Sequence, residues 1–218
     1  MKVFGGIATQ EKALDSKAQS TSREHSNTNV QVQGIDEADI IKTDGNYIYV
    51  INFERNEVTI FTAEEKPKKI TALKGEELLG DKEVKEFKGY KRNINLTDMF
   101  LYKNDSKNYL VLMSSVSRFK ENQQQPSLKE KVIGIMPIYY GEDTTLISIY
   151  DISDIQKPIS VKQYEINGYK LSARLKDGRV YIVTNKGFYY YIRESANNDS
   201  LLPYYIEYGK EAVKKKLM

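Results

Sequence analysis

The sequence lacks cysteine and tryptophan altogether, and it has a single histidine, His25, among 218 residues. Without cysteine there can be no disulfide, no thiolate metal ligand and no cysteine nucleophile. A Ser–His–Asp triad, a histidine zinc site or a haem ligand would each require His25 to enter a packed pocket. His25 lies instead in a polar N-terminal stretch, so the sequence argues against all three kinds of site.

Long apolar runs are missing as well. No stretch approaches the ~18 apolar residues of a membrane-spanning helix, and the longest near-apolar run, residues 132–140, is interrupted by Gly134 and Pro137. The apolar patch at residues 3–8 is short for a secretory signal, which needs ~7–15 apolar residues. We therefore predict no membrane span and no signal peptide in this chain.

The charge balance excludes another class of partner. Lys and Arg number 33 against 30 Asp and Glu, which leaves a net charge of only +3 with the two signs interspersed. Nucleic-acid binding proteins concentrate basic residues into a patch or stripe, which this chain does not show. No Walker or GxGxxG pattern is present either. We therefore predict no nucleic-acid partner.

Tyrosine is abundant, with 17 residues alongside 7 Phe, and it favours strands because its ring packs on a pleated surface while its hydroxyl reaches water. Residues 1–29 are mostly polar, and we expect them to form a tail without fixed structure. From Val30 onward the sequence consists of short runs of residues that favour β-strands, separated by turn residues. The pair Asp44-Gly45 lies between two such runs, which is a strong hairpin pattern.

The same plan recurs along residues 30–218. Residues 171–185 repeat the order of residues 40–52, with Asp177-Gly178 in the place of Asp44-Gly45, and a weaker copy begins near Asp105. Charge-dense residues 76–92 and polar residues 117–131 interrupt the plan as expected surface loops. Repeated four-strand units are typical of β-propeller blades. We therefore predict an all-β, incomplete β-propeller of about three four-stranded antiparallel blades with inserted loops.

Three phrases carry a resemblance to a known family: VQVQGIDEADIIKTDGNYIYVI at 30–51, IYDISDIQKP at 149–158 and NGYKLSARLKDGRVYIVTN at 167–185. Together they resemble a prokaryotic family of secreted β-propeller proteins distantly related to WD40 repeats. The resemblance implies a propeller fold and an extracytoplasmic setting, and it supplies no catalytic residues. An incomplete propeller would need further blades or self-association to cover its open ends.

Acidic residues form two candidate cation sites. Asp36, Glu37 and Asp39 lie close together and could present oxygens to Ca²⁺ or act as an acid–base pair, but they could equally blunt a blade edge. Asp151 and Asp154 could also hold a cation, or each could accept a backbone N–H bond in an Asx turn. We favour the blade-edge role for the first group and the Asx-turn role for the second over cation binding.

An aromatic group near the C-terminus is the candidate ligand surface: Tyr189, Tyr191, Tyr204 and Tyr205. Packing between blades is the alternative role for these rings. The leading hypothesis is a non-catalytic, extracytoplasmic binding or scaffold module for a protein, peptide or glycan, with no cofactor other than a possible Ca²⁺. The alternative is a carboxylate- or Ca²⁺-dependent propeller hydrolase or lyase.

Overall fold

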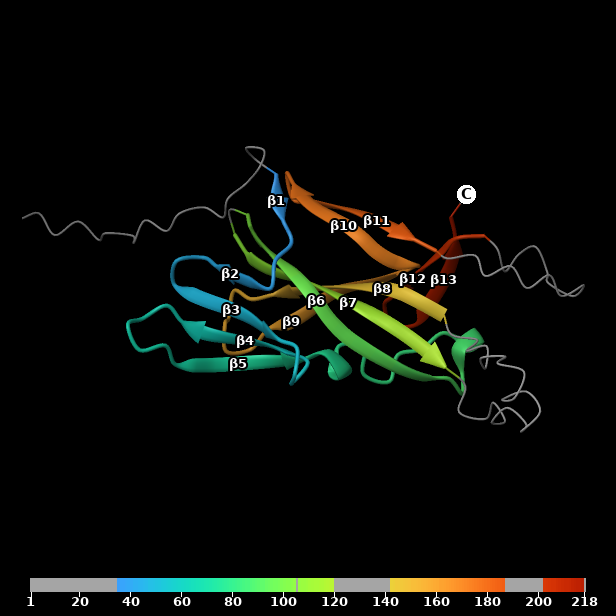
Figure 1. Ribbon diagram of the computed structural model, residues 1–218, viewed down its shortest axis with the longest axis horizontal. Coiled ribbons are helices and arrows are strands. Elements are labelled where there is room, and N and C mark those ends of the chain that lie inside the picture. The colour runs from blue at the N-terminus through green and yellow to red at the C-terminus, as the bar shows by residue number, and fades with distance from the viewer. Residues whose placement is uncertain (1–34, 105, 120–141, 187–201, 218) are drawn as a thin grey trace, which may run out of the picture.

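Three antiparallel β-sheets stack face to face in the computed structural model, which describes residues 35–104, 106–119, 142–186 and 202–217 (Figure 1). The first sheet has the simple order β2-β3-β4-β5. Its strands are β2 (Ile41–Thr43), β3 (Tyr47–Asn52), β4 (Glu57–Thr62) and β5 (Lys69–Lys74). This sheet confirms the predicted four-stranded antiparallel unit.

The second sheet is larger, with the order β13-β12-β9-β8-β7-β6. Its strands are β6 (Lys91–Lys103), β7 (Asn108–Phe119), β8 (Glu142–Asp151), β9 (Ile159–Asn167), β12 (Tyr204–Tyr208) and β13 (Ala212–Lys216). The first four strands follow the predicted plan, and the β12–β13 hairpin extends the sheet because Tyr205 pairs with Ile166 of β9. Six strands in one sheet is therefore a departure from the expected four.

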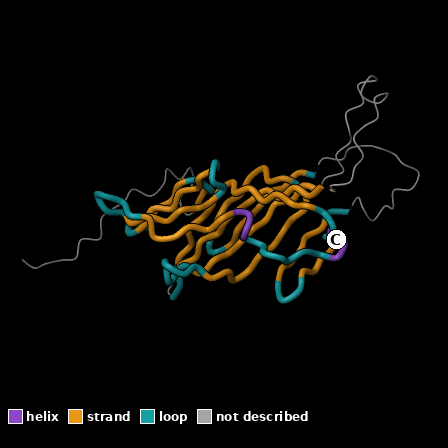
Figure 2. The backbone as a smooth tube through the Cα atoms, turned by 90° about the horizontal axis from the view of Figure 1, so that it is seen from below, coloured by secondary structure: helices purple, strands orange, loops and turns teal. Residues whose placement is uncertain are grey.

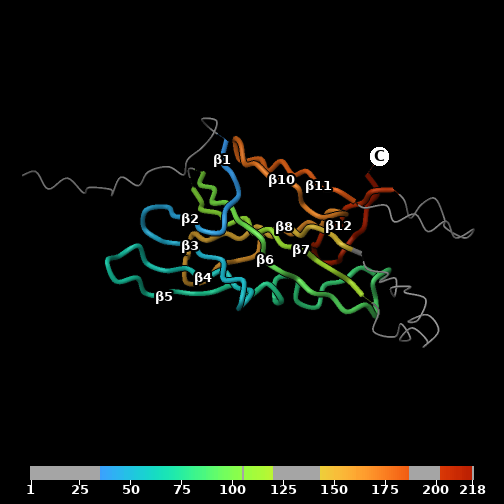
Figure 3. Tube along the Cα trace, in the orientation of Figure 1, coloured from blue at the N-terminus to red at the C-terminus, as the bar shows by residue number. Residues whose placement is uncertain are grey.

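The third sheet consists of the hairpin β10 (Tyr169–Lys176) and β11 (Arg179–Asn185), with β1 (Asp36–Glu37) on the free side of β10. Figure 3 shows this short N-terminal strand beside a hairpin that lies far along the sequence. The third unit thus has only two strands of its own among the described residues. Strands make up most of the described residues, and the helical segments among those residues are two short turns (Figure 2).

Each of the three sheets contains a hairpin whose turn is formed by local contacts: β2–β3, β6–β7 and β10–β11. Asp44 Oδ1 accepts hydrogen bonds from the N–H groups of Asn46 and Tyr47 at 2.9 and 2.8 Å. Asn104 Oδ1 does the same for Ser106 and Lys107 at 3.1 and 2.8 Å. Such Asx turns reverse the chain locally without help from the rest of the fold. The predicted repeat of hairpins is therefore confirmed.

The hairpin turns differ in length, which shifts the alignment of the repeats. Three residues, 44–46, join β2 to β3, and four residues join Lys103 to Asn108. The β10–β11 turn contains only Asp177 and Gly178, both at positive φ, 49° and 70°. A one-residue offset exchanges the two faces of a strand. Residues 47–51 and 180–184 are thus both strands that follow a hairpin turn, as predicted. Residues that align in sequence, however, point to opposite faces of their sheets.

Two apolar clusters join the sheets. On one side of the second sheet, Tyr49, Ile51, Val58 and Ile60 of the first sheet belong to one buried cluster with Leu110 and Leu112 of β7, among others. On the other side, Phe100, Val111, Met113 and Ile147 are clustered with Ala173 and Leu175 of β10. The central sheet is therefore covered on both faces, as the middle blade of three would be.

The connection between β5 and β6, within the expected surface loop at 76–92, is largely exposed but is anchored by buried apolar side chains. It contains two short helical turns, η1 (Gly75–Glu77) and η2 (Lys85–Phe87), and four of its apolar side chains are buried. These are Leu78, Leu79, Val84 and Phe87. Charged residues dominate the composition of this segment, so its spaced apolar anchors form no periodic pattern in the sequence.

Other predictions fall outside the described residues: the tail at 1–29, Asp105, and most of the expected loop at 117–131. Within the described part of the chain, no helix is long and apolar enough to cross a membrane.

Candidate interaction surface and a buried ionic cluster

The three N-terminal carboxylates make separate contacts instead of converging. Asp36 Oδ1 accepts a hydrogen bond from Lys42 Nζ at 2.7 Å, and Glu37 forms an ion pair with Arg174 at 2.9 Å. Asp39 Oδ1 accepts the N–H of Ile40 at 2.7 Å. Asp36 and Glu37 form the edge strand of the third sheet, which agrees with the blade-edge interpretation.

No group of three or more His, Cys, Asp or Glu side chains is placed to hold a metal ion in the part of the chain that the structure describes. The Ca²⁺ hypothesis for Asp36, Glu37 and Asp39 stays a prediction.

Asp151 and Asp154 form the turns that were expected of them. Asp151 Oδ1 accepts the N–H of Ser153 at 3.0 Å, and Asp154 Oδ1 accepts the N–H of Gln156 at 3.1 Å. Asp151 also accepts a hydrogen bond from Lys107 Nζ at 2.6 Å. This bond, with those from Ser153, lowers the pKa of Asp151 to about 2. The Asx-turn interpretation is therefore confirmed.

The four tyrosines predicted to bind ligand do not share one surface. Tyr189 and Tyr191 lie outside the described residues. Tyr204 is buried, with Lys214 Nζ 3.9 Å from its ring centroid. Tyr205 lies on the opposite face of β12, because side chains alternate along a strand, and it is partly exposed. The ligand-binding role of these residues stays a prediction, and Tyr205 is the best placed of the described pair.

Tyr205 belongs to a group that we call the Tyr–Lys face: Lys162, Tyr164, Tyr205, Glu207 and Lys215. These residues come from β9, β12 and β13 and share one face of the second sheet, since Glu207 pairs with Tyr164 and Tyr205 with Lys215. Lys162 Nζ and Lys215 Nζ each lie 5.6 Å from a tyrosine ring centroid. Each ammonium group is therefore close to an aromatic ring, within the range of a cation–π contact.

Hydrogen bonds stabilise the charges of this face. Lys162 Nζ donates to Tyr164 Oη at 3.0 Å, and Lys215 Nζ donates to Glu207 Oε2 at 2.8 Å. These contacts raise the pKa of Lys162 and of Lys215 and lower that of Glu207. All three groups are charged at neutral pH. The Tyr–Lys face thus carries two partly exposed rings, two cations and one anion, and the Tyr164 ring also packs against the apolar cluster between the second and third sheets.

A buried ionic cluster was missed by the sequence analysis. Arg118 and Glu165 have fully buried side chains, and Arg118 Nη2 donates to Glu165 Oε2 at 2.9 Å. Glu83 Oε2 accepts a second hydrogen bond from Arg118 Nε at 3.2 Å, and Tyr208 Oη donates to Glu165 Oε2 at 2.7 Å. The Phe87 ring centroid lies 4.5 Å from Arg118 Cζ. These partners lie far apart in the sequence, and no local pattern marks them.

The environment of the cluster shifts two pKa values. Burial opposes the charge on Arg118, but the hydrogen bonds and charge of Glu165 outweigh it and raise the pKa of the guanidinium. Burial and the neighbouring Glu165 also raise the pKa of Tyr208. Because the central pair is closed to solvent, a substrate could not reach it. We conclude that the cluster fastens the 75–90 connection and the β12–β13 hairpin to β7 and β9.

Comparison with known proteins identifies the fold. A family model described as a beta propeller domain matches residues 25–217. The chain belongs to the beta propeller domain family. No curated protein and no solved structure matches it.

As a propeller, the chain has its first sheet as blade one, strands β6–β9 as blade two, and the β10–β11 hairpin as the start of blade three. The β12–β13 hairpin extends blade two past its fourth strand, β9. The Tyr–Lys face therefore lies where blade two is wider than a four-stranded blade.

Proposed function

We propose that this propeller is a non-catalytic binding module that works outside the cytoplasm and contacts an extended peptide or glycan through its Tyr–Lys face. One observation carries the proposal: Tyr164 and Tyr205 are diagonal neighbours on adjacent strands, each accompanied by a lysine ammonium group. Tyrosine offers contact area at low entropic cost together with a hydroxyl for hydrogen bonding. Lysine and glutamate beside the rings add polar groups that would orient a ligand.

The ion pairing and burial of the carboxylates discussed above support a binding role more than a catalytic one. A glycosidase-like site needs two carboxyl groups about 5–9.5 Å apart and open to substrate. Asp36, Glu37 and Asp151 are each engaged by a cation, and Glu165 is fully buried. The alternative of a carboxylate- or Ca²⁺-dependent hydrolase or lyase would have to release one of these pairs or use other carboxylates, such as Asp39.

The extracytoplasmic setting is supported by the resemblance of the three sequence phrases to secreted propellers. Fractionation of cells that express the native gene, followed by detection with an antibody, tests it. Recovery in the cytoplasmic fraction alone would contradict this part of the proposal.

Binding can be tested with arrays of soluble glycans and of short peptides, followed by calorimetry on any compound that is retained. We expect Tyr205→Ala and Tyr164→Ala to weaken binding at least about tenfold, because alanine substitution of a central aromatic contact commonly costs 2 kcal/mol or more. Tyr169→Ala is the matched control, since Tyr169 is also partly exposed but lies on blade three. If all three variants bind alike, the Tyr–Lys face is not the site.

A further inference from the structure

An aspartate or asparagine precedes glycine at three places in the sequence: Asp44-Gly45, Asn167-Gly168 and Asp177-Gly178. At such a pair the backbone nitrogen of glycine can attack the side-chain carbonyl carbon of the preceding residue, because glycine has no side chain to hinder the approach. The product is a five-membered succinimide ring, which water opens to aspartate or isoaspartate. In a folded protein the reaction requires that both the nitrogen and the side-chain carbonyl group are free to move together.

The pair in the β2–β3 turn is held at both reacting groups. Gly45 donates its backbone N–H to Thr43 Oγ1 at 3.1 Å. Asp44 Oδ2 accepts a hydrogen bond from Tyr49 Oη at 3.0 Å, and Asp44 Oδ1 accepts two backbone N–H groups of the turn. Attack of the Gly45 nitrogen on Asp44 would have to break these bonds, so we expect the fold to suppress the reaction there.

The pair between β9 and β10 is protected in a different way. Asn167 is only 4% exposed, so little water reaches its side chain. Gly168 donates its backbone N–H to the carbonyl oxygen of Asp143 at 3.0 Å. The attacking nitrogen is therefore held in place, and we expect little reaction at Asn167 in the folded protein.

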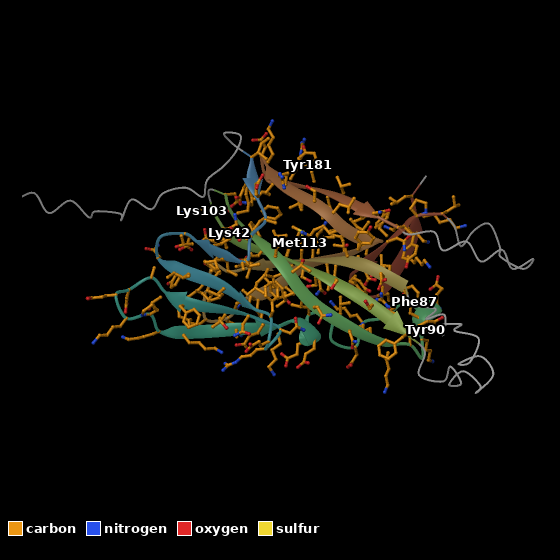
Figure 4. The ribbon with its side chains drawn as sticks, viewed as in Figure 1. Lys42, Phe87, Tyr90, Lys103, Met113 and Tyr181 are labelled. Carbon is orange, nitrogen blue, oxygen red and sulfur yellow. The ribbon has the colours of Figure 1, made fainter. Side chains whose placement is uncertain are left out.

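The pair in the β10–β11 turn has neither kind of protection. Asp177 and Gly178 are both exposed. Within the described part of the chain, no hydrogen bond or ion pair holds the Asp177 carboxylate, and the Gly178 N–H donates to no backbone carbonyl. Figure 4 shows Tyr181, just past this turn, at the outer side of the hairpin and away from the other two sheets. Both reacting groups are thus free and open to water.

We propose that Asp177 is a site of spontaneous isoaspartate formation in the folded protein. The Gly178 nitrogen forms a bond to Asp177 Cγ, and the carboxyl hydroxyl group leaves with the amide proton as one molecule of water. A second water then adds to the main-chain carbonyl carbon of Asp177 and breaks its bond to the Gly178 nitrogen. The chain now continues through Cγ. One water leaves and one is taken up, so the mass is unchanged and no other reagent is consumed.

The modification alters a turn that has little room for change. Isoaspartate adds one carbon atom to the main chain, whereas the turn has only two residues, both at positive φ, 49° and 70°. The turn also packs closely on β6, since a Cβ atom on Gly178 would lie 2.6 Å from Tyr102 Oη. Leu175, which pairs with Val180 in the hairpin and with Asp36 of β1, lies only two residues before Asp177. Isoaspartate at 177 should therefore loosen the β10–β11 hairpin and release β1.

Incubation of the purified full chain at neutral pH and physiological temperature, followed by peptide mapping, tests the site. A lysine-specific protease places the three pairs in separate peptides, residues 43–68, 163–170 and 177–186. Chromatography separates isoaspartyl from aspartyl peptides, and labelling by a protein isoaspartate methyltransferase identifies them. We expect isoaspartate to accumulate several-fold faster at 177 than at 44, with little change at 167.

Incubation in urea shows whether the fold causes the difference. With the chain unfolded, the bonds that hold Asp44 and Gly45 are lost, so the rates at 44 and 177 should become similar, and Asn167 should deamidate readily. Equal rates at 44 and 177 in the folded protein, or no isoaspartate at 177, would overturn the proposal. A difference that persists in urea would show that local sequence causes it, and would overturn the role assigned to the fold.

Hydrogen exchange tests the effect on the hairpin. Incubated wild type should lose protection in β1, β10 and β11 but keep it in β3 and β4, and treatment with the methyltransferase and S-adenosylmethionine should restore it. Asp177→Glu is the matched control, because a glutamate cannot form the five-membered ring. Its exchange before incubation shows whether it folds as the wild type does, and incubation should not change it. Unchanged exchange in wild type that contains isoaspartate at 177 would refute the predicted loosening.

Discussion

Replacing Arg118 by methionine should destabilise the protein more than any surface substitution. The change removes a fully buried cation but keeps most of the side-chain volume. It leaves Glu165, also fully buried, without its charged partner, although Tyr208 and Thr144 still donate hydrogen bonds to it. The cation–π contact with Phe87 and the bonds to Glu83 are lost as well.

The size of the effect follows from the burial of the pair. Removing one partner of a buried salt bridge costs ~3–5 kcal/mol, because the remaining charge stays uncompensated in a low-dielectric interior. Domains are stable by only about 5–15 kcal/mol in total. For a chain of this length each kcal/mol lowers Tm by about 2–4 °C, so Arg118→Met should lower Tm by roughly 6–20 °C.

The double variant Arg118→Met/Glu165→Gln separates charge from packing. Its amide can still accept hydrogen bonds from Tyr208 and Thr144, so we expect it to recover much of the lost stability. Arg55→Met is the matched control, since the Arg55 side chain is 72% exposed, and it should change the free energy of unfolding by less than about 0.5 kcal/mol. Urea unfolding followed by circular dichroism measures all three. A double variant no more stable than Arg118→Met would refute the reasoning.

Further substitutions test three local features. The pKa of Asp151 is lowered to about 2, below the ~3.9 of an unfolded chain, so its ion pair should stabilise the fold above about pH 4 and cease to do so as the pH falls to about 2. Asp151→Asn should therefore lower Tm at pH 7 and match the wild type near pH 2 in thermal melts. Gly168→Ala should cost more in urea unfolding than Gly80→Ala. Both positions have positive φ, 91° and 53°, but only at Gly168 would the new Cβ meet a backbone oxygen, at 2.6 Å. Asn56 has φ 48° and bonds the backbone of β6 at 2.6 and 2.9 Å; Asn56→Gly should lose about 1–3 kcal/mol by thermal melt, and Asn56→Ala more. Equal losses in the last two variants would show that backbone strain is unimportant there.

Predictions from sequence succeeded where the physical cause is local. The strands at 47–52 and 179–185 follow from β-type runs beside Asp-Gly turns, and the Asx turns at Asp151 and Asp154 involve hydrogen bonds that span two residues. They failed where the cause is distant. Leu79 and Phe87 in the connection before β6 are buried by contacts that no local pattern shows.

By itself, the sequence determined an all-β chain of repeated hairpins, because turn chemistry and residue alternation act over a few residues. Tertiary structure decided which faces meet. The two-residue turn at Asp177-Gly178 placed Tyr181 on the face of the hairpin away from the second sheet. The pairing of β12 with β9 left Tyr205 partly exposed, whereas Tyr204 is buried. Only the packed fold brings Arg118 next to Glu165, because the residues around each of them in the sequence do not indicate that the two will pair. The energy of such contacts depends on burial, which arises only when the sheets stack.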